Sequence, residues 1–353
     1  MNFGSDNVVG ASPIVMDALA RANQGAAAGY GNDTIAARVT DRLKAVFERD
    51  LSVFLVTTGT AANALSLAAL APPWGSVLCH VEAHVNQDEC GAPEFFSGGA
   101  KLVGLPGLCG KLTPDVVAAH LAEASHAPPP HAVKPAALTL TQATEVGTVY
   151  KPSEIATLAD LAHSHGLAVH MDGARFANAL VRLGVSPAEL TWKAGVDILS
   201  FGATKNGCLA AEAIVVFDPA RADHLAERRK RSGHLLSKGR FLSAQLDAYL
   251  ADDHWLALAR HANAMADRLA GGLAARGIRL GLPVEGNEIF AVLPTGLHAT
   301  LKDAGFVYYE WPTASLPPEA APHAGEVVVR LVTSFATTEA EVDALLGHVA
   351  RAS

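Results

Sequence analysis

The chain has 353 residues, of which half are hydrophobic and 18% are charged. This composition supplies a large core and excludes a globally disordered protein. The net charge of −8 argues against nucleic acid or an anionic membrane as the main partner. The length predicts about two domains, which we place at residues 1–250 and 251–353.

Neither a secretion signal nor a membrane span is expected. The first seven residues lack the basic and then apolar layout of a signal peptide, and no apolar run approaches the ~18 residues that a span needs. The four cysteines form no CxxC pair and have no metal-ligand spacing. We therefore expect reduced thiols, no metal site and a cytoplasmic protein.

Strands and helices alternate from residue 51 to residue 217. This alternation is typical of an α/β domain with a mainly parallel sheet and helices on both faces. The expected strands cover residues 51–56, 76–81, 101–105, 136–141, 167–175 and 197–201, and the expected helices cover residues 13–23, 34–49, 61–70, 113–125 and 155–165.

The chain after residue 250 predicts a smaller α+β domain. Its last helix is expected to begin at Thr338, where Thr338 and Glu341 can form a capping box. A long helix is expected over residues 252–276, and strands are expected over residues 288–293, 306–311 and 326–333.

One lysine follows a buried strand directly. The apolar run at residues 197–201 ends in a turn of small residues that carries Thr204 and Lys205. A lysine in a desolvated pocket loses basicity and can attack an aldehyde. Taken alone, the pattern fits a strand-end lysine that reaches water equally well.

A turn rich in glycine and threonine joins the strand at residues 51–56 to the next helix. Gly59 and Thr60 lie where free N–H groups and the helix dipole favour an anion. The turn is neither a G-x-G-x-x-G fingerprint nor a Walker A loop, so it fits one phosphate better than a dinucleotide. Many such turns carry glycine and threonine for conformational reasons alone.

Two further polar residues, His84 and Asp172, lie at or beyond expected strand ends. Ligand residues collect at this edge of open α/β sheets, although His84 could equally be a structural histidine. Asp172 and Lys205 are about one βαβ unit apart, so both are expected at the same sheet edge.

Together these residues match the requirements of pyridoxal 5'-phosphate. A lysine forms a Schiff base with its aldehyde, and a carboxylate keeps the pyridine nitrogen protonated so that the ring accepts electrons. Backbone amides hold the phosphate, and an imidazole can stack on the ring.

Three runs resemble the low-specificity L-threonine aldolases, a pyridoxal-phosphate family with the aspartate-aminotransferase-like fold (fold type I). They are residues 170–175 (His-Met-Asp-Gly-Ala-Arg), 204–207 (Thr-Lys-Asn-Gly) and 5–7 (Ser-Asp-Asn). The resemblance covers nearly the whole chain, including residues 59–63 and 329–331.

The resemblance implies a role for each cofactor residue. Lys205 would carry the cofactor, Asp172 would pair with the pyridine nitrogen, and Arg175 would bond the ring hydroxyl oxygen. His84 would stack on the ring and help to move the proton of the substrate hydroxyl. The phosphate contacts would be Gly59, Thr60 and Thr204.

The resemblance also implies the residues on the substrate side. Ser5 and Arg330 would hold the amino-acid carboxylate, which suits a planar guanidinium. Lys238 matches a basic residue that reaches the site of the neighbouring subunit; its basic segment, residues 228–240, could also be a solvated helical face. Where some members carry a histidine, the turn at residues 142–147 has Glu145 as the nearest counterpart.

The activity implied is retro-aldol cleavage of L-threonine, L-allo-threonine and related β-hydroxy-α-amino acids to glycine and an aldehyde, in a homodimer or homotetramer with shared sites. β-Elimination or transamination with the same cofactor remains an alternative. A non-catalytic relative is a further alternative, but it has no physical need of a buried lysine. A NAD-dependent oxidoreductase fits the alternation of strands and helices but lacks its glycine fingerprint.

Overall fold

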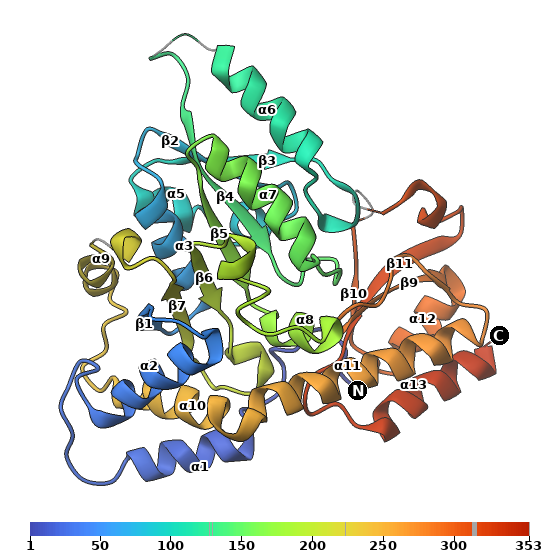
Figure 1. Cartoon of the computed structure of the whole chain (residues 1–353). Helices are drawn as coiled ribbons and strands as arrows, with labels where there is room; N and C mark the ends of the chain where they lie inside the picture. The colour runs from blue at the N-terminus through green and yellow to red at the C-terminus, as the bar shows by residue number, and fades with distance from the viewer. Residues whose placement is uncertain (127, 129, 223, 313–315, 353) are drawn as a thin grey trace.

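The computed structural model describes residues 1–126, 128, 130–222, 224–312 and 316–352. The larger part of the fold is a seven-stranded sheet with the order β1-β7-β6-β5-β4-β2-β3 (Figure 1). Its strands are β1 Ser52–Val56, β2 Gly75–His80, β3 Lys101–Leu105, β4 Lys134–Thr141, β5 Ala168–Gly173, β6 Ile198–Phe201 and β7 Glu212–Val216.

Six of the seven strands run in one direction. The pairs β3–β2, β2–β4, β4–β5 and β5–β6 are parallel, and β7 is antiparallel to both β6 and β1. The link between β6 and β7 is too short for the crossover that a parallel pair requires, so β7 turns back. The mainly parallel sheet is confirmed, and the reversed strand β7 begins at the edge where its neighbours end.

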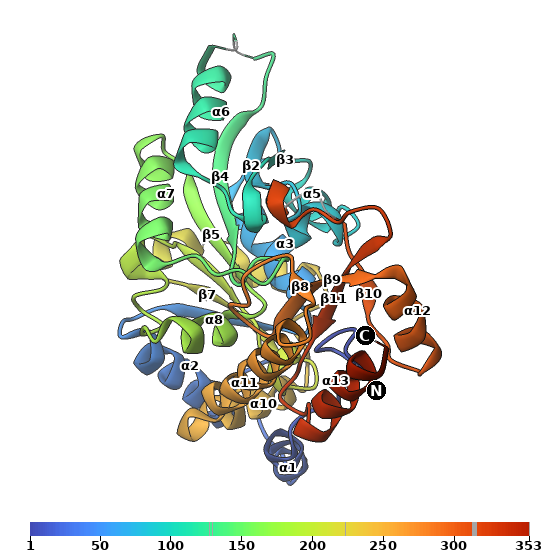
Figure 2. The same cartoon turned by 90° about the vertical axis from the view of Figure 1, so that its right-hand side faces the viewer.

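Helices cover both faces of this sheet, as expected (Figures 1 and 2). Side chains alternate across the pleat: Ile198 packs toward α3, whereas Leu199 and Phe201 join the core under α7 and α8. The helices are α1 Pro13–Ala22, α2 Thr34–Phe47, α3 Gly59–Leu70, α4 His84–Gln87, α5 Ala92–Ser97, α6 Pro114–His126, α7 Pro152–Ser164, α8 Phe176–Leu183, α9 Leu225–Arg231 and α10 Arg240–Leu250.

A second sheet is antiparallel and has the order β10-β11-β9-β8. It packs with three helices around a separate core, which confirms the smaller α+β part; the boundary at residue 250 stays a prediction. The elements are α11 His254–Ala274, β8 Arg279–Leu280, β9 Glu288–Pro294, α12 Thr295–Asp303, β10 Tyr309–Glu310, β11 Glu326–Val332 and α13 Glu339–Ala352.

The beginning of the chain belongs to this second core. Phe3 is buried in it, donates its N–H to Val307 O at 2.8 Å and accepts the N–H of Val332 at 2.8 Å. Because the N-terminal residues pair with Val307, only Tyr309–Glu310 of the strand expected at 306–311 pairs with β11. Residues 5–7 therefore leave the second core and enter the space between the two sheets.

Three helix boundaries differ from the prediction for local reasons. The helix expected from residue 252 begins at His254, because Asp252 and Asp253 have positive φ angles of 51° and 53°. The helix expected to reach residue 49 ends before Glu48, which also has positive φ. The helix expected from residue 61 begins at Gly59, capped by the Thr58 side chain. The capping box at Thr338 and Glu341 is confirmed.

None of the helices in the described part of the chain is both long and apolar enough to cross a membrane. The four cysteines are free thiols, as expected.

Candidate active site

A cavity of about 220 Å³ opens at the edge where the parallel strands end. It contains six of the seven expected cofactor residues; Arg175 lies outside its lining. The lining residues come from the N-terminal segment, from the ends of β1, β5 and β6 and the turns after them, from the beginning of α3 and α4, and from the start of β7. They are Asn7, Thr57, Thr58, Gly59, Thr60, Ala62, Asn63, His84, Asp172, Ala174, Ser200, Gly202, Thr204, Lys205 and Glu212.

Lys205 lies in a single 3₁₀ turn, Thr204–Asn206, between β6 and β7. The next side chain, Asn206, is buried and donates to Tyr249 Oη and Trp255 O, both at 2.8 Å. The turn is therefore held by hydrogen bonds to α10 and α11. Lys205 itself is half-buried and, among the described residues, has no hydrogen bond or ion pair. An amine in such a position is available to a ligand carbonyl group.

Glu212 stabilises the same turn through its backbone N–H groups. Its carboxylate accepts the N–H groups of Ala203 at 2.9 Å and Thr204 at 3.3 Å. Burial raises the pKa of Glu212 to about 7, against the lowering effect of hydrogen bonds from Thr204 and Ala203 and of the Lys205 charge. Sequence reasoning missed this residue; the available signal was one acid at the start of an otherwise apolar strand.

Asp172 lies at the end of β5 and is buried. Asn63 Nδ2 donates to its Oδ2 at 2.8 Å, and the Ala174 N–H donates to its Oδ1 at 3.0 Å. In the layer beneath, His170 bonds with Thr139 and Ser200, and burial lowers its pKa to about 4 although Asp172 opposes this. Because His170 is neutral, the charge of Asp172 is left for a cationic group in the cavity.

His84 begins α4, and its Nδ1 lies 2.8 Å from Glu89 Oε1. The same oxygen accepts Asn63 Nδ2 at 2.8 Å, so one amide bridges the carboxylates of Glu89 and Asp172. The hydrogen bond to Glu89 is the largest effect on His84 and raises its pKa. Asn63 and Glu89 were not predicted, because a polar residue inside an apolar helix and an acid just after a short turn carry no motif.

The first turn of α3 presents free donors to the cavity. Thr58 caps the helix by accepting the Ala61 N–H at 3.1 Å. Among the described residues, the N–H groups of Gly59 and Thr60 have no acceptor. A Cβ atom built at Gly59 would meet nothing within 4 Å, so there is room for an anion at this helix end.

A buried charge cluster lies on the substrate side. Arg175 donates from Nε to Asp6 Oδ2 at 2.7 Å and from Nη2 to Asp6 Oδ1 at 3.1 Å, and Asn287 Nδ2 donates to Asp6 Oδ2 at 3.0 Å. These bonds fix the segment that carries Ser5, whose Oγ accepts the Asn7 N–H at 3.1 Å. The expected bond from Arg175 to the cofactor ring stays a prediction.

Arg330 reaches the same region from β11. Its guanidinium lies 4.1 Å from the centre of the Trp311 ring, and its Nη2 donates to Gly4 O at 3.3 Å. Glu145 is half-buried and interacts electrostatically with both Arg330 and His84. Glu145 is thus close enough to act on the charges of both the expected carboxylate contact and the expected base.

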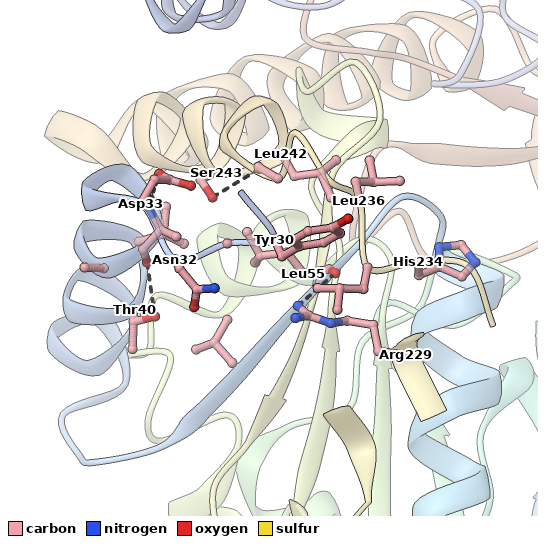
Figure 3. Close-up of a pocket in the computed structure, with 17 residues that line it drawn as sticks. Tyr30, Asn32, Asp33, Thr40, Leu55, Arg229, His234, Leu236, Leu242 and Ser243 are labelled. Carbon is pink, nitrogen blue, oxygen red and sulfur yellow. Dashed lines mark hydrogen bonds between the residues drawn. The ribbon is translucent and has the colours of Figure 1, made fainter. Parts of the chain in front are cut away.

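Lys238 does not line the cavity of its own chain and is exposed. It lies in the loop before α10, beside the loop of Tyr30, whose N–H donates to Ser237 O at 2.9 Å. A second cavity, of about 330 Å³, is lined by residues that include Tyr30, Leu236, Arg229 and His234 (Figure 3). His234 Nδ1 is 3.0 Å from Thr57 Oγ1, and Thr57 also lines the first cavity.

Among the described residues, no group of three or more His, Cys, Asp or Glu side chains is arranged to hold a metal ion. A free lysine, a buried aspartate, a histidine and a helix end with free N–H donors face one cavity of this sheet, an arrangement that fits the pyridoxal-phosphate fold type I class. Comparison with known proteins then narrows the class. Residues 2–295 match the beta-eliminating lyase family, so the chain belongs to that family.

Its relatives include two proteins described as low specificity L-threonine aldolase. The one from Pseudomonas aeruginosa is 47% identical over 87% of this chain and 88% of its own. The one from Pseudomonas sp. (strain NCIMB 10558) is 42% identical over 98% of this chain and 96% of its own. The solved structure of Leishmania major threonine aldolase is 30% identical, with a TM-score of 0.91 over 99% of this chain and 98% of its own. Serine palmitoyltransferase from Sphingomonas wittichii, 18% identical with a TM-score of 0.70, shares the fold.

Proposed function

We propose that the protein cleaves L-threonine, L-allo-threonine and related β-hydroxy-α-amino acids to glycine and an aldehyde, with pyridoxal 5'-phosphate as its cofactor. The observation that carries the proposal is the half-buried Lys205, without a partner among the described residues, in one cavity with Asp172 and His84. Similarity to L-threonine aldolases over most of the chain supports the substrate class.

The residues of the cavity fit this cofactor. Lys205 would hold the aldehyde carbon, Asp172 the pyridine nitrogen, and the free N–H groups of Gly59 and Thr60, with Thr204, the phosphate. When bound, pyridoxal phosphate supplies an electron-accepting ring that stabilises the carbanion left at Cα by bond cleavage. Asp172 is suited to its role because two hydrogen bonds fix it and the neutral His170 leaves its charge uncompensated.

His84 is the proposed base. Its Nδ1 bonds with Glu89, which fixes the ring and leaves Nε2 with the free lone pair in the neutral form. His84 Nε2 would take the proton of the β-hydroxyl group as the bond between Cα and Cβ breaks. Glu89 would stabilise the imidazolium that forms, in agreement with the raised pKa of His84.

Ser5 and Arg330 are the proposed contacts of the substrate carboxylate. The ion pair between Asp6 and Arg175 holds the Ser5 segment against the large sheet. The ring of Trp311 supports the Arg330 guanidinium. With the carboxylate held on this side and the amino group at Lys205, the β-carbon would face His84 and Glu145, which could contact its side chain.

We further propose a cytoplasmic homodimer or homotetramer in which Lys238 reaches the site of a partner subunit. Exposure of Lys238 away from its own cavity supports a role in trans. Mixing Lys205→Ala with Lys238→Ala subunits tests it: a site with both lysines forms only if Lys238 acts across the interface. No recovered activity in verified hybrid oligomers would contradict this arrangement, and sedimentation gives the number of subunits.

The decisive test of the reaction uses purified protein loaded with pyridoxal phosphate. L-Threonine should give equal amounts of glycine and acetaldehyde, and Lys205→Ala should abolish both the product and the visible absorbance of the bound cofactor. Lys193→Ala removes an exposed lysine paired with Glu48 and serves as the control. Full turnover by Lys205→Ala would exclude the proposal.

β-Elimination is the second candidate, because the matching family is described as beta-eliminating lyase. The same incubation separates the two reactions, since elimination from a β-hydroxy amino acid gives a keto acid and ammonia. A keto acid as the main product would replace the aldolase proposal.

A further inference from the structure

Glu288 is a buried carboxylate to which the proposed reaction assigns no role. It is the first residue of β9, and its side chain is 0% exposed. Neither of its oxygens has a hydrogen-bond donor among the described residues. A carboxylate in this position loses its hydration and gains no hydrogen bond in return. Its partners are two guanidinium groups.

Each oxygen of Glu288 faces a different arginine. Oε2 lies 3.3 Å from Arg175 Nη1, and Oε1 lies 3.7 Å from Arg330 Nη1. Arg175 is otherwise well bonded, because Asp6 occupies its Nε and Nη2. Arg330 is less well bonded, since its buried Nε has no acceptor and its contact with Glu288 is long. Of the two guanidinium groups in this cluster, that of Arg330 is the less well satisfied.

With Glu288 ionised, this cluster holds three carboxylates and two guanidinium groups, and the Lys205 ammonium group also acts on Asp6. The charged groups that act on Glu288 are Arg175, Arg330, Asp6 and Glu145, from four different segments of the chain. Hydrogen bonds from Arg175 and Asn287 compensate the charge of Asp6. Glu288 accepts no hydrogen bond among the described residues, so its negative charge is the less well compensated of the two. Burial raises the pKa of Glu288 to about 7, against the lowering effect of Arg175 and Arg330. Both protonation states are therefore populated near neutral pH.

We propose that Glu288 is the counter-ion that Arg330 exchanges for the substrate carboxylate, and that Glu288 takes up one proton from solvent in the exchange. The inference rests on the proposed function, in which Arg330 holds that carboxylate. Before binding, Glu288 keeps Arg330 paired. After binding, the ligand carboxylate occupies Arg330, and an ionised Glu288 would remain as a poorly compensated buried charge. Proton uptake at a Glu288 oxygen removes that charge.

The sign of the pH effect follows directly. Below the pKa of Glu288 the carboxyl group is already neutral and binding requires no proton. Above it, each pH unit weakens the affinity about tenfold, because binding includes the uptake of one proton. The ligand carboxylate stays ionised throughout this range.

The experiment uses the protein loaded with pyridoxal phosphate and 3-hydroxybutanoate as the probe. This compound has the carboxylate and the hydroxyl group but no amino group, so its charge is constant between about pH 6 and about pH 9. Calorimetric titration in two buffers of different ionisation enthalpy counts the protons. Near one proton per site at the upper pH is expected for the unmodified protein, with a dissociation constant that rises with pH.

Glu288→Gln should remove both the uptake and the pH dependence, and it should bind the probe more tightly than the unmodified protein at about pH 8.5. Glu123→Gln, on the exposed side of α6, is the matched control and should behave like the unmodified protein. Zero uptake by the unmodified protein overturns the proposal even if the variant does not fold. Uptake that persists in Glu288→Gln assigns the proton to another group, such as His84, and also overturns it.

An Arg330→Gln variant separates this failure from failure of the proposed function. If Arg330→Gln binds the probe as well as the unmodified protein, Arg330 does not hold the carboxylate, and the proposed roles of Arg330 and of Glu288 are both wrong. If Arg330→Gln loses binding while the unmodified protein takes up no proton, only the role of Glu288 is wrong.

Discussion

Arg175 binds Asp6 through two hydrogen bonds, from Nε at 2.7 Å and from Nη2 at 3.1 Å. This pair joins the large sheet to the beginning of the chain. Arg175 holds the pKa of Asp6 at about 2, although burial acts in the opposite direction. The pair is thus charged at all physiological pH values, and it fixes the distance between the residues of the large sheet and Ser5.

Replacing Asp6 should therefore affect both stability and substrate binding. Asp6→Ala leaves Arg175 buried without its main partner, which is expected to cost about 3–5 kcal/mol of the free energy of unfolding. The KM for L-threonine should rise more than the cofactor dissociation constant, since Ser5 loses its support. Denaturant unfolding and kinetics measure the two effects. Asp343→Ala breaks an exposed pair with Arg268 and should change neither much; an equal effect of the two variants would contradict the prediction.

Asn63 is expected to be needed for the electrostatics of the site. Asn63→Ala removes a donor shared by Asp172 and Glu89, so two buried carboxylates face each other without it. A hydrogen bond to a charged group contributes about 1.5–3 kcal/mol, so we expect kcat/KM to fall by about 10–150-fold. The affinity for pyridoxal phosphate, followed by absorbance, should weaken as well. Ser66→Ala, one turn further along α3 and buried, is the control for helix packing. Unchanged kinetics in Asn63→Ala would exclude the bridging role.

The pH profile of the reaction should report the pair of His84 and Glu89. A base acts in its neutral form, so kcat/KM rises as pH passes the pKa of His84, which lies above its ordinary value of 6.5. Glu89→Gln removes the largest cause of that raised pKa, so the rising limb should move to lower pH. If the rising limb of kcat/KM stays at the same pH in Glu89→Gln, a group other than His84 is responsible for it. Glu82→Gln, nearby but not in the cavity lining, provides the comparison.

Glu212 is expected to control cofactor affinity through the turn of Lys205. In Glu212→Gln an amide group replaces one of the oxygens that accept the N–H groups of Ala203 and Thr204. One donor then faces another donor, which costs about 1–3 kcal/mol. We expect the dissociation constant of pyridoxal phosphate to rise by about 5–150-fold. Glu227→Gln, in α9, is the control. An unaltered dissociation constant would show that the turn does not need the carboxylate.

Glu212 and Glu288 also predict how stability depends on pH. Both have a pKa of about 7 in the folded protein against 4.5 for a free side chain. Between these values each of the two carboxyl groups is ionised in the unfolded chain and protonated in the folded chain, so its contribution to the free energy of unfolding falls as pH rises from about 4.5 to about 7. In the cofactor-free protein, the free energy of unfolding of either Gln variant should therefore lack this contribution to the pH dependence, which denaturant unfolding at several pH values measures. The same pH dependence in the unmodified protein and in a Gln variant would contradict the assignment of that carboxyl group.

The strand-end residues could be predicted because the carboxyl ends of parallel strands meet at one edge. Position after a strand was enough to bring Asp172, Lys205 and Gly59 to one cavity. Glu212 escaped this reasoning, because a rule about strand ends does not cover the first residue of a reversed strand. The apolar pattern of β7 resembles that of its neighbours, so the reversal is visible only in the length of the β6–β7 link.

The supporting residues could not be predicted for a different reason. Asn63 and Glu89 act through other side chains, and their spacing is set by how α3 and α4 pack against the sheet. Arg175 was expected at the cofactor ring, and its bonds to Asp6 depend on the path of the first seven residues, which carry no periodic pattern. Such long-range contacts follow from the fold as a whole.

The reversed strand β7 has a mechanical consequence. Residue Glu212 is paired in register with Val56, the last residue of the edge strand β1. Beyond Val56 lies the turn proposed for the phosphate, and before Glu212 lies the turn of Lys205. A cofactor held at both turns would therefore clamp an edge strand to its neighbour at one end. Without that clamp β1 should open first, so amide hydrogen exchange in β1 and β7 should slow when pyridoxal phosphate is added, ahead of any change in β4 or β5.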